Sequence, residues 1–551
     1  MKRPVPHSTM LAVALMGATF GSFAQTGMAD TPFHRAAAFD PVAIAEDDAR
    51  REAEGELRLY ARSLAIDLSS EADGSWSITD HERIGRLGVA SPGAKAMELL
   101  IEGMTVPPGA RMRVIAMDGT ELHPFFEIEL PEGVHEYSTP LVNGDAWILE
   151  YREPLDAPFH GTFRIPWLNH AYRDVMEDHA REGTCHVNVA CVPESIGWED
   201  EIDATVRISV ITPQGSGWCS GSLVNNVRQD CAPYILTAWH CGRTSTTAQF
   251  NQYKFYFNFQ YATCAGGAYS TSQMMTGAQL KAYSDDYAPQ YQGVGGSDFM
   301  LLRTNAAEVP ASFDPFWAGW DARNIASVSE DGVCIHHPTG APKRISSYTQ
   351  TLTTGHPMGS SGLMSHYKLK WAPTENGYGV TEVGSSGSGV FKPHPTAGPV
   401  LIGTLTGSSS GSNCTYNTGT NYFGKMSYHW TNNPNTAQQK LKAWLDPDGT
   451  NTLVLAGSRS PCSEPTAVAE SKAPSVVLHP NPATERLWVR GADGTPWKWM
   501  ILDAAGRIIS NGAMTHGDRS IALHGLAPGM YFLQLIDPAE RRLREPFVVA
   551  Y

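Results

Sequence analysis

Three short segments of the chain carry residues whose types could perform nucleophilic chemistry. His240 follows an apolar run, Asp298 opens another, and Ser388 lies in the glycine-rich segment Gly384–Gly389. A serine hydroxyl becomes a useful nucleophile when a histidine within hydrogen-bond reach takes its proton and a carboxylate orients that histidine. Flanking glycines permit a tight turn that presents backbone N–H groups beside the serine. Taken singly, each residue also has a structural explanation. Ser388 fits an ordinary glycine-rich loop, His240 fits a buried histidine beside a cysteine, and Asp298 fits a cap at the start of a strand.

The composition and the N-terminus indicate a folded protein that is exported. The 551 residues are 42% hydrophobic and 18% charged, with a net charge of −15 and no basic stripe, so nucleic acid is not an expected partner. Lys2 and Arg3 precede the apolar run 11–20, and small residues follow it, which predicts a signal peptide over residues 1–24. A buried N-terminal helix is the alternative. The apolar run is too short to cross a bilayer, and no other transmembrane segment is expected.

The cysteines fit an oxidising destination. Eight of the nine lie between Cys185 and Cys414, and the ninth, Cys462, lies in a linker-like stretch. None forms the paired spacing of a zinc site, so the sequence favours disulfides. Adjacent His336 and His337 on a strand would point to opposite faces, so we expect them to be structural rather than metal ligands. No metal and no cofactor is expected.

Short apolar runs separated by turn residues predict a mainly β protein built from several units. Residues 25–180 form a β-rich unit without cysteine. Residues 181–457 contain many short strand-like runs and one helical pattern near 437–445, which suits a double β-barrel. Residues 458–474 have the composition of a linker, and residues 475–551 form a last small β unit.

The segment from Cys185 to about residue 456 resembles the bacterial lysyl endopeptidases, a branch of the chymotrypsin-like serine proteases. The chain order His, Asp, Ser is that of the chymotrypsin type. The matching pieces, in family order over about half of the chain, are GSLVNN (221–226), LTAWHCG (236–242), SDF (297–299), FWAGWD (316–321), IHHP (335–338), KRIS (343–346), GVTE (379–382) and the serine segment. The resemblance implies a chymotrypsin-like double β-barrel with His240, Asp298 and Ser388 as its catalytic triad. It further implies an oxyanion hole made by the N–H groups of Ser386 and Ser388.

The resemblance also implies a disulfide framework. Its pattern pairs Cys185 with Cys414, Cys191 with Cys264, and Cys219 with Cys241. The two cysteines then left in this segment, Cys231 and Cys334, are inferred to pair with each other.

The sequence departs from the family at three positions. Gly387 precedes the predicted nucleophile where chymotrypsin has the aspartate that receives the new N-terminus, so that switch cannot operate as in trypsin. Thr406 stands where the lysyl enzymes have a histidine beside a tryptophan matched by Trp371. Asn421 stands where those enzymes place the aspartate of the S1 pocket, and an amide supplies no charge for a substrate ammonium. We therefore expect weaker selection for lysine at P1. Alternatively, the shorter loop moves Asn421 elsewhere and another acid, such as Glu382, supplies the charge.

The flanking units carry resemblances of their own. The N-terminal unit resembles propeptides of secreted bacterial proteases through TPLVNGDA (139–146). The C-terminal unit resembles the type IX secretion (Por) sorting domain through HPNPAT (479–484), LDAAG (502–506) and LHGLAPGMY (523–531), with a carbohydrate-binding or spacer sandwich as the alternative. Because the N-terminal unit has no cysteine and the family resemblance starts just before Cys185, we expect residues 25–180 to be removed on maturation, with a cut near 181–183.

The resemblances together imply a secreted serine endopeptidase of a Gram-negative bacterium, extracellular or at the cell surface. Its expected partners are protein or peptide substrates and the secretion machinery, and we expect a monomer. The rival hypothesis is a protease-fold binding protein without activity, although such a protein would usually lose a triad residue and this chain keeps all three residue types.

Overall fold

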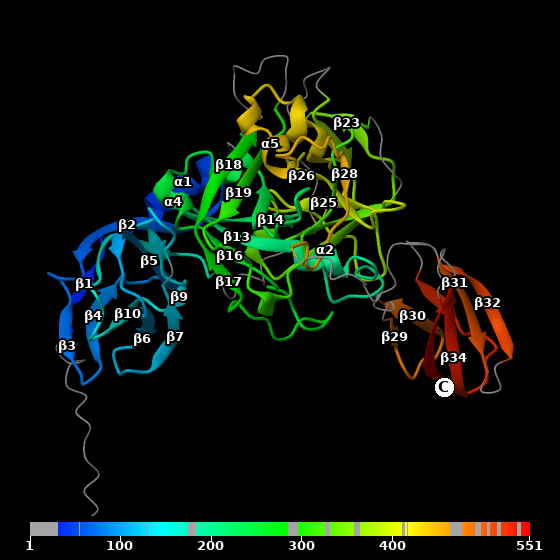
Figure 1. The fold of residues 1–551 in the computed structure, drawn as a ribbon, viewed down its shortest axis with the longest axis horizontal. Helices are drawn as coiled ribbons and strands as arrows, with labels where there is room; N and C mark the ends of the chain where they lie inside the picture. Colours follow the sequence, from blue (N-terminus) through cyan, green and yellow to red (C-terminus); the bar gives the residue numbers. More distant parts are fainter. Residues whose placement is uncertain are drawn as a thin grey trace, which may run out of the picture.

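The computed structural model of the chain describes residues 31–53, 56–128, 130–174, 183–284, 296–325, 331–356, 364–409, 414–415, 417–462, 476–490, 497–503, 507–514, 519–536 and 542–550. The predicted signal peptide, most of the predicted linker and most of the predicted cut region lie outside these residues. Figure 1 shows a blue N-terminal unit, a green-to-yellow central unit and an orange-to-red C-terminal unit, all built mainly from strands.

The N-terminal unit is a β-sandwich of two sheets. One sheet has the order β1 (Phe33–Arg35), β4 (Glu82–Ala90), β10 (Ala146–Pro154), β6 (Arg111–Ile115) and β7 (Glu121–Glu127), with β3 (Ser75–Ile78) beside β4. The other has the order β2 (Leu59–Ser69), β11 (Thr162–Ala171), β5 (Ala96–Thr105) and β8 (Tyr137–Ser138), with β9 (Val142–Asn143) beside β5. Apolar side chains from both sheets, among them Leu99, Trp147 and Ile165, fill the space between them. This confirms the β-rich unit that the alternating apolar runs predict.

The sequence pattern gave no sign of the helix that precedes this sandwich. Helix α1 (Pro41–Ala53) begins where the Asp40 carboxylate accepts the backbone N–H groups of Val42 and Ala43 at 2.9 and 3.2 Å. Proline at the first helical position suits this start, because its missing N–H needs no partner there. The helix carries the acidic run 46–48 followed by Arg50 and Arg51 rather than an apolar stripe, which explains why periodicity did not predict it.

The central unit contains two β-barrels. The strands of the first pair in the order β17 (Met274–Thr276), β16 (Lys254–Tyr256), β13 (Thr205–Thr212), β14 (Gly215–Val224), β15 (Tyr234–Thr237), β19 (Phe299–Thr304) and β18 (Ala278–Ser284). Three short helices accompany them: α2 (Glu199–Ala204), α3 (Trp239–Gly242) and α4 (Thr247–Phe250). The barrel interior is apolar and holds Ile208, Phe255 and Leu302.

The second barrel follows in the chain. Its order is β12 (Val187–Asn188), β22 (Arg344–Tyr348), β21 (Gly332–His336), β25 (Gly389–Lys392), β26 (Val400–Ser408), β27 (Asn421–Lys425), β24 (His366–Leu369) and β23 (Thr353–Gly355), with β20 (Trp320–Asp321) between β26 and β28 (Val454–Leu455). The helical pattern near 437–445 forms two short pieces, a 3₁₀ turn (Ala437–Gln439) and α5 (Lys442–Leu445). The predicted chymotrypsin-like double β-barrel is confirmed.

The C-terminal unit is a small two-sheet sandwich, as predicted. One sheet has the order β29 (Val477–His479), β30 (Arg486–Arg490) and β33 (Ser520–Ala522). The other has the order β32 (Ile508–Met514), β31 (Trp497–Leu502), β34 (Gly529–Ile536) and β35 (Arg542–Val549). Its core contains Leu487, Ile501 and Leu533.

Strand β2 joins the N-terminal sandwich to the first barrel. It runs antiparallel to β14, with Leu59 opposite Gly217, Ala61 opposite Ser216 and Arg62 opposite Gly215. Gly215 is required there, because a Cβ atom would lie 2.0 Å from the carbonyl oxygen of Ala61. The two units therefore share one continuous sheet.

The disulfides correct one prediction. The pairs Cys185–Cys414, Cys191–Cys264 and Cys219–Cys241 form as the resemblance implied, but Cys231 bonds to Cys462 and not to Cys334. Cys334 lies on β21 inside the second barrel, whereas Cys231 precedes β15 of the first barrel, and the stretch through Cys462 packs back on that barrel. Residues 458–462 therefore belong to the folded central unit rather than to a linker.

The free cysteine gives a direct chemical test. Cys334 is fully buried, and burial raises the pKa of its thiol to about 12. Native protein should release almost no chromophore from Ellman's reagent, and denatured, unreduced protein should release one equivalent per chain. Three equivalents after denaturation would contradict the Cys231–Cys462 bond.

The described part of the chain contains no helix with both the length and the apolar character needed to span a membrane.

Candidate active site

His240 and Asp298 form a hydrogen-bonded pair on the first barrel. His240 lies in α3, directly after β15, and Asp298 directly precedes β19, which pairs with β15. The imidazole Nδ1 is 2.7 Å from Asp298 Oδ2, and the backbone N–H of His240 donates to Oδ1 at 2.9 Å. Asp298 is buried and has a left-handed backbone (φ 50°), an unfavourable conformation for a non-glycine residue that is often found at functional sites. This is the base-and-orienter geometry of a hydrolase.

Ser388, the predicted nucleophile, does not reach this pair. Its side chain is fully buried, and its hydroxyl lies 3.2 Å from the Cys334 sulfur inside the second barrel. Its backbone N–H donates to the Ser385 carbonyl at 3.0 Å and is therefore not available to a substrate. Ser388 directly precedes β25, where the chain has already entered the barrel wall. Because Ser388 is buried and its N–H group is occupied, the prediction that Ser388 is the nucleophile and an oxyanion-hole donor is corrected.

Ser386, two residues before Ser388, is the serine of this loop that faces the cleft. It is partly exposed and lines the same cleft as His240. Its carbonyl accepts the N–H of Ser220 on β14 at 2.8 Å, which ties the serine loop of the second barrel to the first barrel. One signal in the sequence distinguishes the two serines: the oxyanion hole of this protease type uses the residue two before the nucleophile, which is a glycine. Gly384 stands two residues before Ser386, whereas Ser386 itself stands two before Ser388.

Two backbone N–H groups are available beside Ser386. Within the described residues, the N–H groups of Gly384 and Ser386 donate to no other protein atom. Gly384 has φ +93°, and a Cβ atom there would lie 2.9 Å from the His337 carbonyl oxygen, so only glycine fits. Such a pair of N–H groups can bind the oxyanion of a tetrahedral intermediate, and one donor is typically worth about 3 kcal/mol.

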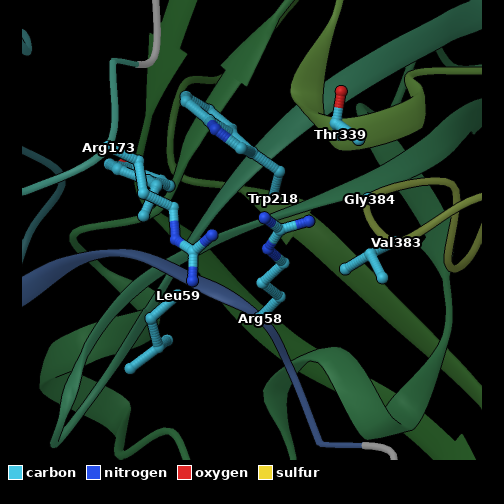
Figure 2. Close-up of a pocket in the computed structure, with 8 residues that line it drawn as sticks. Arg58, Leu59, Arg173, Trp218, Thr339, Val383 and Gly384 are labelled. Atoms are coloured by element: carbon cyan, nitrogen blue, oxygen red, sulfur yellow. The ribbon is translucent and has the colours of Figure 1, made fainter. Parts of the chain in front are cut away.

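The cleft is bordered by all three structural parts around it. The first barrel supplies His240 and Trp218, and the second supplies Thr381, Gly384, Ser386 and residues 405–408. The N-terminal unit supplies residues 56–58 and Arg173. Figure 2 shows the Arg58 side chain pointing to Trp218 and the Arg173 side chain pointing between Trp218 and Leu59, with Val383 and Gly384 of the serine loop on the other side of Arg58. The N-terminal unit therefore covers part of the cleft.

Asn421 lies behind the cleft wall. It is fully buried at the start of β27, and its Oδ1 accepts the hydroxyl of Thr381 at 2.7 Å. Thr381 itself lines the cleft. Thr406 also lines it, and its hydroxyl lies 3.0 Å from the ring nitrogen Nε2 of buried His366.

Glu382, the alternative S1 acid, also borders the cleft, but its carboxylate contacts residues at the start of the central unit. Its carboxylate lies 3.2 Å from His186 Nε2 and accepts the Gly183 N–H at 3.4 Å. Although burial opposes it, the contact with His186 lowers the pKa of Glu382. His186 and Glu382 also lie beside Cys414, but the Cys414 sulfur is bonded to Cys185 and offers no thiolate to a metal.

Two family profiles match the chain, in different parts. Residues 179–424 match the lysyl endopeptidase C-terminal domain. This part of the chain is therefore similar to the lysyl endopeptidases. Residues 477–549 match the secretion system C-terminal sorting domain, so the chain carries a type IX sorting domain and is a secreted or cell-surface protein.

Individual relatives are more distant. The lysyl endopeptidase of Pseudomonas aeruginosa is 27% identical over 290 residues, which cover 50% of this chain and 57% of that protein. Among solved structures, a thermostable serine protease from an extremophilic microorganism matches with TM-score 0.30 and 18% identity, covering 41% of this chain and 93% of that one. A scabies mite inactivated protease paralogue matches with TM-score 0.28 and 12% identity, covering 42% of this chain and 92% of that one.

Proposed function

We propose that this protein is a secreted serine endopeptidase with His240, Asp298 and Ser386 as its catalytic triad. The observation that carries the proposal is the cleft in which a bonded His240–Asp298 pair and Ser386 stand beside two available backbone N–H groups. The similarity of residues 179–424 to lysyl endopeptidases supports the same reaction.

The reaction follows from these groups. The Ser386 hydroxyl attacks the scissile carbonyl carbon while His240 Nε2 takes its proton, and the N–H groups of Gly384 and Ser386 hold the resulting oxyanion. The imidazolium, stabilised by Asp298, then gives the proton to the leaving amine as the C–N bond breaks. Water, deprotonated by the same imidazole, hydrolyses the acyl-enzyme and restores the serine. No cofactor takes part in these steps.

The chain organisation that fits this activity is a zymogen. Residues 1–24 act as the signal peptide and residues 25–180 as the propeptide. Residues 181–457, with the packed extension through Cys462, form the protease, and residues 475–551 address the enzyme to the secretion machinery. The mature enzyme acts as a monomer on protein or peptide substrates.

The proposal is tested with a fluorophosphonate, which phosphonylates activated serines. Mature secreted protein should be labelled at one residue, and peptide mapping by mass spectrometry should find the label on Ser386. Protein that is folded and mature but unlabelled, with no hydrolysis of a peptide library, would favour the rival hypothesis of an inactive protease-fold binding protein.

P1 specificity depends on Asn421 in this proposal. The Thr381 wall of the cleft is backed by an amide instead of a carboxylate, and Glu382 faces His186. We therefore expect selection for lysine at P1 to be weak, with uncharged polar or small residues accepted. Asn421→Asp should raise the preference for lysine by about 30-fold or more, since one partner of a buried charge pair is typically worth about 2–5 kcal/mol.

The measurement is the P1 profile of a digested peptide library. Glu382→Gln is the matched control and should leave that profile unchanged. Strict cleavage after lysine by the unaltered enzyme, lost in Glu382→Gln, would transfer the specificity role from Asn421 to Glu382.

A further inference from the structure

The loop that carries Ser386 is organised around the side chain of Ser385. The Ser385 hydroxyl accepts the N–H of Glu382 at 3.1 Å, and its backbone N–H donates to the Glu382 carbonyl at 2.9 Å. The Ser385 carbonyl accepts the N–H of Ser388 at 3.0 Å. Ser385 stands between Gly384 and Ser386, the two residues whose N–H groups are available to an oxyanion. A rotation of Ser385 would therefore move both donors.

A buried histidine holds this serine in place. His336 Nδ1 lies 2.8 Å from the Ser385 hydroxyl, and His336 Nε2 lies 3.0 Å from the hydroxyl of Ser346 on β22. The three side chains are almost completely buried. Burial, with a smaller contribution from nearby His186 and Arg344, keeps the pKa of His336 well below its usual range. The imidazole is therefore neutral, and its two nitrogens can serve one donor and one acceptor.

The hydrogen-bonded chain Ser346–His336–Ser385, called the relay below, is held rigid by the second barrel. His336 ends β21, which pairs with β22 on one side and with β25 on the other. Ser346 and His336 thus sit on adjacent strands of one sheet, and β25 is the strand that the serine loop enters. The relay ties the loop to the sheet from within and places no charge on the loop.

With Ser386 as the nucleophile, the residue directly before it is Ser385 and not Gly387. This is the position where chymotrypsin carries the aspartate that receives its new N-terminus, and here it carries a neutral hydroxyl bonded to a neutral imidazole. We propose that His336 is a positioning residue that, through Ser385, fixes the oxyanion-binding N–H groups of Gly384 and Ser386. The inference rests on the proposed peptidase function of the same cleft.

The test compares His336→Phe with His337→Phe in the mature enzyme. Both histidines are fully buried, but His337 Nδ1 bonds to the Ala341 carbonyl outside the serine loop. Removing one oxyanion donor costs about 10²–10³ in kcat. His336→Phe should shift the N–H groups of Gly384 and Ser386 without removing them, so we expect kcat to fall by about 10- to 100-fold. KM for a peptide amide should stay within about twofold, and inhibition by a peptide aldehyde, which forms a tetrahedral adduct, should weaken in proportion to kcat.

Activity is divided by the folded fraction of each variant, measured from an unfolding curve. A loss of stability is then not counted as a loss of catalysis. Ser385→Ala should show the same kcat loss, and the double variant His336→Phe/Ser385→Ala should lose little more than either single change, since both act on one relay. His336→Phe with wild-type kcat and aldehyde affinity, or with losses equal to those of His337→Phe, would overturn the proposal. The unaltered enzyme and Ser386→Ala, measured alongside, report separately on the peptidase function.

Discussion

Ser386→Ala should abolish peptide hydrolysis and fluorophosphonate labelling, with kcat lowered by about 10⁶-fold as for serine knockouts in other serine proteases. Ser386 is the serine of the loop that is partly exposed in the cleft with His240. Removing its hydroxyl leaves the His240–Asp298 pair with no nucleophile to activate. Thermal unfolding should change little, because that hydroxyl makes no described contact inside the protein.

Ser388→Ala is the matched control, since it makes the same chemical change two residues away. Its hydroxyl faces the Cys334 sulfur inside the barrel, so its loss should leave kcat within a few-fold and alter stability by about 1 kcal/mol. The opposite pattern, an inactive Ser388→Ala beside an active Ser386→Ala, would restore the nucleophile that the sequence predicted. Kinetic constants and labelling of both purified variants decide the matter.

The uncut chain should be nearly inactive because its N-terminal unit covers part of the cleft. Tyr60 stacks on Trp218 with ring centroids 4.4 Å apart, and β2 occupies the edge of β14. Glu98 of the N-terminal unit forms a completely buried ion pair with Lys254 of the first barrel. We expect the precursor to react with the fluorophosphonate at least about 100-fold more slowly than the mature enzyme, since an attached unit competes at millimolar effective concentration.

Glu98→Gln should release this inhibition in the uncut chain. It leaves the Lys254 ammonium buried without a carboxylate, which typically costs about 3–5 kcal/mol and weakens docking by more than 100-fold. Labelling of the precursor should therefore rise toward the mature rate. Glu71→Gln, an exposed carboxylate on the same unit, serves as the control and should stay slow. A precursor that already reacts at the mature rate would show that the N-terminal unit does not restrict the site.

The sequence by itself determined the features that depend on local pattern and chain order. Alternating apolar runs predicted the strands of all three β-rich units, and the order His240, Asp298 and a glycine-flanked serine predicted a triad of the chymotrypsin type. Three disulfides followed from family spacing. These features could be predicted because residue periodicity and motif spacing are properties of the sequence itself.

Only the tertiary structure decided between chemically equivalent residues. Ser386 and Ser388 flank the same glycine, and the positive φ of Gly387 together with the entry into β25 turns one serine to the cleft and the other to the core. Cys231 found Cys462 rather than Cys334 because a disulfide needs Cα atoms close in space, here 5.1 Å apart, whatever their separation of 231 residues along the chain. Side-chain direction and long-range proximity depend on how barrels and loops pack. For the two serines, the only local signal was Gly384, two residues before Ser386.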